Sequence, residues 1–139
     1  MLKSYTFWLK TASVILILTA CIHSLSLFND PVPANDTEKQ LIDLMGNYKM
    51  DLGAGFQPTM SDLFTSMSVC FSMLYLFGGL LNLYLLRKKA GADLLSGVIR
   101  IETLIYGVTF VVFLCFTFLP PIVLAGLVVA CLAMAWWRV

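Results

Sequence analysis

Charged residues are scarce in this chain, and so are the patterns that most enzymes use for chemistry. Only 12% of its 139 residues are charged, one is a histidine, and the four cysteines stand alone at positions 21, 70, 115 and 131. The chain therefore lacks the paired cysteines of membrane oxidoreductases that transfer electrons between thiols and quinones. It also lacks a Gly-rich phosphate-binding loop and a nucleophile elbow. We therefore expect no cofactor, and a non-enzymatic role is favoured over catalysis.

The net charge of +1 gives no reason to expect a nucleic-acid partner, but it conceals a segregation of charge along the chain. Six of the eight acids lie between the first two apolar stretches: Asp30, Asp36, Glu38, Asp43, Asp51 and Asp62. Seven of the nine bases lie near the other ends of the apolar stretches: Lys3, Lys10, Arg87, Lys88, Lys89, Arg100 and Arg138. The positive-inside rule then predicts cytoplasmic N- and C-termini and an acidic outer loop.

Apolar residues make up 60% of the sequence, which is outside the range of soluble globular proteins. A bilayer core of about 30 Å requires roughly 20 apolar residues per helix, so four spans occupy most of the chain. We predict one transmembrane domain over residues 1–139, an all-α integral membrane protein built as an antiparallel four-helix bundle. The expected segments are spans at 7–28, 63–86, 95–118 and 119–137, an outer loop at 29–61 and an inner loop at 87–94.

The first span has an alternative interpretation as a secretion signal. Two lysines precede an apolar run that ends Leu18-Thr19-Ala20-Cys21, which is typical of a bacterial lipoprotein signal cleaved before the cysteine. However, the apolar run continues to Phe28, whereas the apolar region of a signal peptide ends after about 7–15 residues. A membrane-spanning helix is therefore the favoured interpretation.

The outer loop carries the pattern of a short amphipathic helix. Pro31 and Pro33 make its entry extended, and Asp36 or Thr37 is expected to cap the helix. Four apolar residues recur at helical spacing on one face: Leu41, Leu44, Met45 and Tyr48. We predict that this helix forms a lid over the bundle, and that Gly53-Ala54-Gly55 provides a flexible break after it.

The second span carries a stripe of small or polar residues at alternating steps of four and three: Ser61, Thr65, Ser68, Ser72, Tyr75, Gly79 and Asn82. Lipid cannot satisfy their hydrogen bonds, so the stripe is expected to face the bundle interior. Thinner stripes occur on the other spans: Ala12, Thr19, His23 and Ser26; Glu102, Tyr106, Thr109, Phe113 and Thr117; and Gly126 with Ala130. The pattern predicts a partly polar seam, in which packing is favoured over a ligand cavity.

Glu102 is the most informative single position, because an acid at the centre of a membrane helix costs about 2.5–3.5 kcal/mol. Arg100 lies on a different helix face and is expected to extend to the interface. Asn82 lies at a similar distance from the inner loop and is the predicted partner, with Tyr106 as a second. The structural interpretation is a shallow hydrogen-bonded acid. The functional one is a site for a proton, a cation, or an amine or hydroxyl group.

His23 is the only histidine and is expected near the outer end of the first span. Cys21, Cys70 and Cys115 share its half of the membrane and supply the ligand types of zinc or copper, but the spacing fits no metal motif. A satisfied polar histidine without metal is favoured. The candidate ligand-binding residues are Glu102, His23, Tyr75, Asn82, Tyr106, Ser68 and Ser72.

Two stretches, one leading into the second span at 56–64 (FQPTMSDLF) and one within it at 77–83 (FGGLLNL), resemble the second helix of a family of uncharacterised small four-helix bacterial membrane proteins. In size and topology the chain is also similar to DoxX-like membrane proteins, some of which are subunits of quinone-linked oxidoreductases. Four-helix sterol isomerases share the architecture but use several intramembrane acids, where this chain offers only Glu102. These resemblances imply the bacterial inner membrane and carry over no catalytic residue.

The sequence thus predicts a small inner-membrane protein that binds a hydrophobic small molecule or lipid, or packs as an accessory subunit against a partner. Its expected partners are the bilayer, such a ligand, and a second copy joined through the face of Gly126 and Ala130. The alternative is a membrane-embedded enzyme or redox subunit acting on a lipid-soluble substrate such as a quinone. Glu102, His23 or Tyr75 would then contact the substrate.

Overall fold

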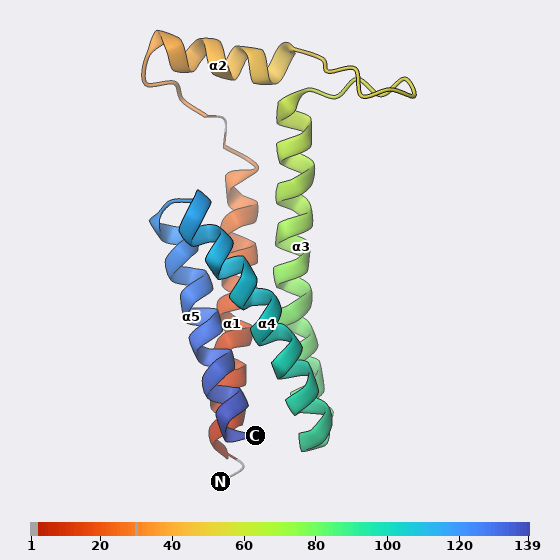
Figure 1. Ribbon diagram of the computed structural model, residues 1–139, viewed down its shortest axis with the longest axis vertical. Helices are drawn as coiled ribbons and strands as arrows, with labels where there is room; N and C mark the ends of the chain where they lie inside the picture. The colour runs from red at the N-terminus through yellow and green to blue at the C-terminus, as the bar shows by residue number, and fades with distance from the viewer. Residues whose placement is uncertain (1–2, 30) are drawn as a thin grey trace. The chain divides into compact units, whose positions relative to one another are not determined.

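A computed structural model describes residues 3–29 and 31–139 of the chain, so Asp30 of the acidic loop lies outside the described residues. The described residues form five helices and no named strand (Figure 1). The helices are α1 (Lys3–Ser26), α2 (Asp36–Asn47), α3 (Met60–Arg87), α4 (Ala92–Phe116) and α5 (Leu119–Arg138). All except α2 are long and apolar enough to cross a membrane. The prediction of an all-helical chain with four candidate spans is confirmed.

Local chemistry explains where the long helices begin. At the start of α3, the Thr59 backbone N–H and hydroxyl both donate to Asp62 Oδ2 at 2.8 Å, which satisfies groups that the first turn leaves unpaired. Pro120 and Pro121 lie in the first turn of α5, where a missing N–H costs nothing. The 28 residues of α3 extend about 42 Å, compared with about 30 Å for the 20 residues of α5.

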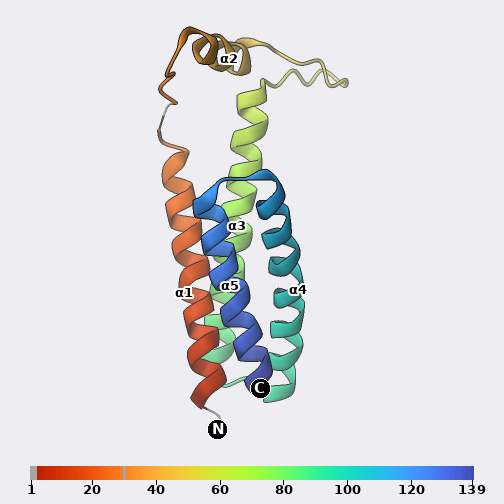
Figure 2. The ribbon, with the colours of Figure 1, turned by 60° about the vertical axis from the view of Figure 1, so that its left-hand side comes forward.

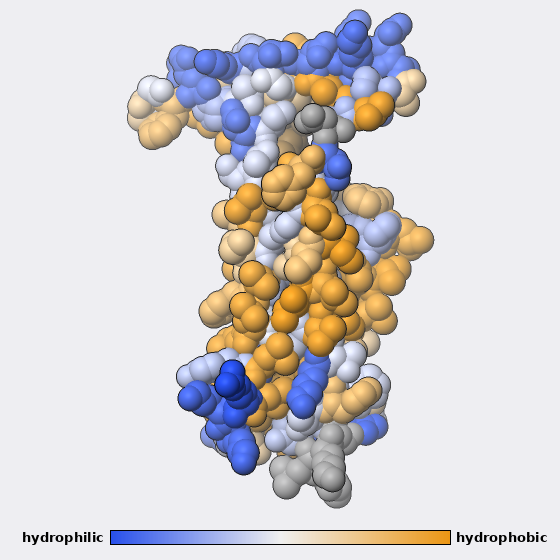
Figure 3. Space-filling view, turned by 180° about the vertical axis from the view of Figure 1, so that it is seen from behind, coloured by the Kyte–Doolittle hydropathy of each residue, from blue (hydrophilic) through white to orange (hydrophobic). Residues whose placement is uncertain are grey.

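The chain divides into two compact units. The first contains the residues up to Ala20 together with Leu74–Val139, so it holds most of α1, the second half of α3, and α4 and α5. The second is Cys21–Met73, with the end of α1, all of α2 and the first half of α3. Figure 3 shows hydrophobic side chains along the long helices, with hydrophilic ones gathered at helix ends and over α2.

The core of the first unit follows a heptad-like spacing on every helix. The buried residues that follow this spacing are Leu9, Ala12, Leu16 and Thr19 of α1; Tyr75, Gly79 and Asn82 of α3; Leu95, Ile99, Glu102 and Tyr106 of α4; and Ala125, Val128, Leu132 and Ala135 of α5. Steps of three and four average 3.5 residues, the repeat that keeps one seam facing its neighbours along the helices. In Figure 2, α4 and α5 lie side by side, and they pack directly.

Gly79 sets the approach of α1 to α3. A Cβ at this position would lie 2.7 Å from Ile17 Cγ1 and 2.8 Å from the backbone oxygen of Ser13. Both distances are shorter than van der Waals contact, so only glycine permits the two backbones to come this close. The predicted polar stripe of α3 is accordingly buried from Ser72 onward, whereas Ser61 and Thr65 are exposed.

The expected small-residue face of α5 is only partly in contact with the rest of the chain. Gly126 is half-buried beneath Phe110, whose Cε2 would lie 3.1 Å from an added Cβ, but Ala130 is exposed. The buried face is instead the one that carries Val128 and Leu132. The prediction missed it because α5 contains no polar residue between its ends that would distinguish one face from another.

The second unit contains α2 as predicted, with a different cap. Asn35, not Asp36 or Thr37, is the N-cap: its Oδ1 accepts the Glu38 backbone N–H at 2.9 Å, while the Glu38 carboxylate accepts the backbone N–H of Ala34. Asn is a favourable N-cap because its side-chain oxygen accepts an N–H of the first turn. A Glu three residues later reaches back and accepts a backbone N–H at the entry to the helix. Within this unit α2 runs across the direction of α3 (Figures 1 and 2).

A hairpin loop, residues 49–59, joins α2 to α3. The Met50 N–H donates to the Pro58 oxygen at 3.0 Å and the Leu52 N–H to the Phe56 oxygen at 3.2 Å. Gly53-Ala54-Gly55 forms the turn, and all three residues have positive φ (83°, 52° and 81°). The expected flexible break is therefore a closed turn, in which the two glycines adopt a left-handed conformation at little cost.

Candidate functional site

A buried hydrogen bond joins α3 to α4 in the first unit. The Asn82 side-chain amide Nδ2 donates to Glu102 Oε2 at 2.6 Å. Asn82 is fully buried, and only 7% of Glu102 is exposed. The predicted partnership of these two residues is therefore confirmed. A hydrogen bond to a carboxyl group in an apolar setting is stronger than one in water, so this bond fixes how the two helices face each other.

The connection between the helices explains why these two residues meet. After α3 ends at Arg87, a tight turn follows in which the Ala90 N–H donates to the Leu85 oxygen at 3.0 Å and Lys89 has a φ of 53°. Gly91 is the N-cap of α4. A connection of only four residues returns the chain beside itself, so side chains at matched depths on the two helices face one another.

Two tyrosines complete the cluster. The rings of Tyr75 and Tyr106 meet edge to face, with centroids 5.3 Å apart and an interplanar angle of 73°. The Tyr106 hydroxyl lies against Gly78, where an added Cβ would overlap with it and would lie 3.6 Å from Glu102 Oε1. Sequence reasoning did not single out Gly78, although the Gly-Gly pair at 78 and 79 was a usable signal. We call Tyr75, Gly78, Asn82, Glu102 and Tyr106 the buried polar cluster.

Glu102 has few polar groups around its carboxyl group. Among the described residues its one hydrogen-bond partner is Asn82, and the expected bond from Tyr106 is not formed. The Tyr106 hydroxyl lies against Gly78. Arg100 does not neutralise the acid, since its guanidinium lies 5.8 Å from the ring centroid of Trp136 on α5. The Asn82 Oδ1 atom is also buried, and it has no hydrogen-bond partner within residues 3–29 and 31–139. The cluster thus has an unused acceptor directly beside a carboxyl group.

The remaining candidate residues belong to the second unit. Ser72 is buried, and its Oγ has no hydrogen-bond partner in the described part of the chain, while Ser68 is half-buried. His23 is half-buried, and its ring meets the Phe71 ring edge to face with centroids 4.7 Å apart. An edge-to-face contact of this kind indicates that His23 packs against α3. The structure thus groups four of the seven predicted residues, Tyr75, Asn82, Glu102 and Tyr106, in one cluster.

The structure offers no support for a zinc or copper site formed by His23 and the cysteines of its half of the membrane. Cys21, Cys70 and Cys115 are exposed free thiols. Over the described residues, no group of three or more His, Cys, Asp or Glu side chains gathers as metal ligands do. These cysteines are therefore assigned no role at a site.

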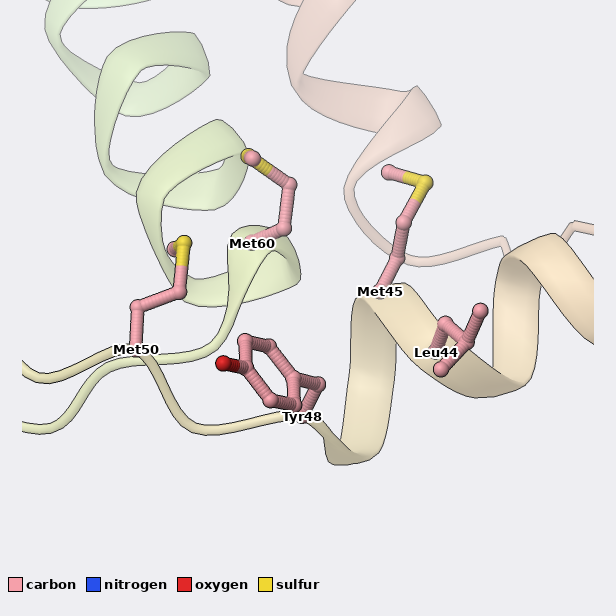
Figure 4. Close-up of a pocket in the computed structure, with 5 residues that line it drawn as sticks. All are labelled: Leu44, Met45, Tyr48, Met50 and Met60. Atoms are coloured by element: carbon pink, nitrogen blue, oxygen red, sulfur yellow. The ribbon is translucent and has the colours of Figure 1, made fainter.

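The second unit holds an apolar pocket of about 350 Å³ between α2, the hairpin loop and the start of α3. Five residues line this outer pocket: Leu44, Met45, Tyr48, Met50 and Met60. Figure 4 shows the three methionine side chains pointing toward the side on which α3 continues, with the Tyr48 ring lying between α2 and the hairpin loop. The sequence pattern identified the α2 residues and missed Met50 and Met60, because only closure of the hairpin loop brings them to α2.

Comparisons with protein-family models, with curated proteins and with solved structures found no match. The resemblances drawn from residues 56–64 and 77–83 therefore stay predictions. Two features of the structure bear on function: the buried polar cluster of the first unit and the outer pocket of the second.

Proposed function

We propose that this protein is a multi-pass protein of the bacterial inner membrane that holds a lipid or another hydrophobic molecule in its outer pocket. Four candidate spans support insertion, and the connection of only two residues between α4 and α5 supports an antiparallel bundle. The bases at Arg87, Lys88, Lys89 and Arg138 support cytoplasmic termini, because short cytoplasmic segments are enriched in Lys and Arg. The acidic loop with α2 then lies on the outer side.

The outer pocket is the observation that carries the proposal. Its volume of about 350 Å³ falls within the range of ligand pockets, about 300–1,000 Å³, and its lining is apolar. Three of its five lining residues are methionines, whose unbranched, polarizable side chains adapt to ligands of irregular shape. Such a lining suits an alkyl chain better than a polar metabolite, because each buried methylene contributes about 0.8 kcal/mol.

The position of α2 supports a lipid as the ligand. None of its residues is buried in the protein, and Leu41, Leu44 and Tyr48 are each more than half exposed. A helix with one apolar face and acidic residues elsewhere is the type that lies in a membrane interface. Because the pocket methionines point along the direction in which α3 continues, an acyl chain could enter from the bilayer without crossing water (Figure 4).

Native mass spectrometry in mild detergent, with lipid extraction of the same sample, tests this proposal. The wild type is expected to retain one lipid or hydrophobic molecule per chain. Leu44→Glu places a charge in the outer pocket and is expected to abolish retention. Leu41→Glu makes the same change one turn away on α2, outside the pocket lining, and is expected to retain the molecule. Equal retention by both variants, or a wild type that carries nothing, would reject the proposal.

A further inference from the structure

The buried polar cluster contains a hydrogen-bond acceptor, Asn82 Oδ1, that has no donor among the described residues although the Glu102 carboxyl group lies beside the same amide. Asn82 offers two N–H donors and one oxygen acceptor, and the structure uses a donor, at 2.6 Å to Glu102 Oε2. Its Oδ1 is buried and has no donor among the described residues. A buried acceptor without a donor costs about 1–3 kcal/mol. We therefore expect some group to donate a hydrogen to Asn82 Oδ1.

Glu102, whose Oε2 accepts the amide N–H of the same Asn82 side chain, can supply one when it is protonated. An ionised carboxylate is only an acceptor, whereas a protonated carboxyl group carries one O–H donor. A carboxylic acid and a primary amide can form two opposed hydrogen bonds in one closed ring: amide N–H to carboxyl oxygen, and carboxyl O–H to amide oxygen. The first of these bonds is present between Asn82 and Glu102.

We propose that Asn82 and Glu102 form a proton-binding site within the bundle, where the proton rests on Glu102 Oε1 and is shared with Asn82 Oδ1. This goes beyond the lipid-binding proposal, because it concerns a different unit and a different ligand. The bound proton satisfies both members of the pair and removes a charge that no cation among the described residues balances.

The surroundings fit a proton better than a metal ion. The titratable side chains buried in the first unit are Tyr75 on α3, Tyr106 on α4 and Cys131 on α5, all of which are uncharged in their protonated forms. On α1 the buried residues are apolar or hydroxyl-bearing, and the Ser13 and Thr19 hydroxyls donate to backbone oxygens of their own helix. Arg100 is exposed and stacks on Trp136. A cation would therefore find few oxygen ligands beyond the Asn82–Glu102 pair.

Infrared difference spectroscopy of the protein at pH 7 tests the proposal. A protonated carboxyl group has a carbonyl stretch above the amide bands, and this stretch shifts in heavy water once the proton exchanges. The wild type is expected to show such a band, and Glu102→Gln is expected to lack it. Asp93→Asn is the matched control on the same helix, and because Asp93 is exposed, this variant is expected to keep the band.

Stability measurements provide a readout that does not depend on detecting the band. Glutamine can make both ring bonds without a proton, so Glu102→Gln is expected to unfold within a few degrees of the wild type at pH 7. At alkaline pH the wild type is expected to lose stability as the proton leaves, whereas Glu102→Gln is not. Absence of a band that depends on Glu102, or wild-type stability that rises on adding sodium at pH 7, would overturn the proposal in favour of an ionised carboxylate.

Discussion

The close approach of α1 and α3 at Gly79 predicts a clear penalty for adding one methyl group. In Gly79→Ala the new Cβ would lie 2.7 Å from Ile17 Cγ1 and 2.8 Å from the Ser13 backbone oxygen. The Ile17 side chain can rotate away, but the Ser13 oxygen belongs to the helix backbone and moves only if α1 moves. Overpacking of this kind costs about 1–3 kcal/mol. The intrinsic preference of helices for Ala over Gly offsets about 1 kcal/mol of this cost, so the expected net loss is up to about 2 kcal/mol relative to the wild type. Relative to a glycine-to-alanine change that meets open space, the expected loss is the full cost of about 1–3 kcal/mol.

Two glycines of α4 are matched controls for this substitution. A Cβ at Gly97 or Gly107 meets nothing within 4 Å. Gly97→Ala and Gly107→Ala are therefore expected to stabilise the protein slightly, by up to about 1 kcal/mol from helix propensity alone. The assay is denaturant unfolding of purified protein in one detergent for all three variants. A Gly79→Ala variant as stable as the two controls would refute the close approach of α1 and α3.

Three further substitutions test the hydrogen bonds and the hairpin loop. Asn82→Leu removes the donor to Glu102 and is expected to cost about 1–3 kcal/mol in the same unfolding assay; an unchanged stability would mean that the bond does not form. Asn35→Ala removes the cap of α2, which contributes about 1 kcal/mol, and is therefore expected to speed amide hydrogen exchange in α2. Exchange in α4 is expected to stay unchanged. Gly53→Val places a β-branched residue at a φ of 83° and is expected to open the hairpin loop and reduce retention of the bound molecule in native mass spectrometry, whereas Gly46→Ala on α2 is not.

The sequence predicts the helices well because the signals are local. A run of about 20 apolar residues has few alternatives to a membrane helix, and the amphipathic pattern of α2 extends over only twelve residues. The Asn82–Glu102 pair was also predictable, since both residues lie at matched depths from one short connection. Tyr106 was predicted to belong to this site, but the position of its hydroxyl was not predictable, because it depends on the missing side chain of Gly78 on the neighbouring helix.

The outer pocket and the buried face of α5 were less predictable for different reasons. Met50 and Met60 reach the pocket only because Met50 pairs with Pro58 across the hairpin loop, a contact that periodicity does not reveal. On α5, Gly126 and Ala130 were attractive as small residues, yet the chain buries the face of Val128 and Leu132. A uniformly apolar helix gives no polar contrast from which to choose a face.

A nitroxide scan in bilayers tests most directly whether the apolar side of α2 faces lipid, as the proposed function requires. The background would replace Cys21, Cys70, Cys115 and Cys131 with alanine, and single labels would then be placed at Met45, in the outer pocket, and at Asp43, which is exposed. We predict that the label at Met45 collides with oxygen dissolved in the bilayer and is shielded from a water-soluble nickel reagent, with the opposite result at Asp43. If both labels meet the nickel reagent equally, α2 stands in water and the account of the outer pocket is wrong.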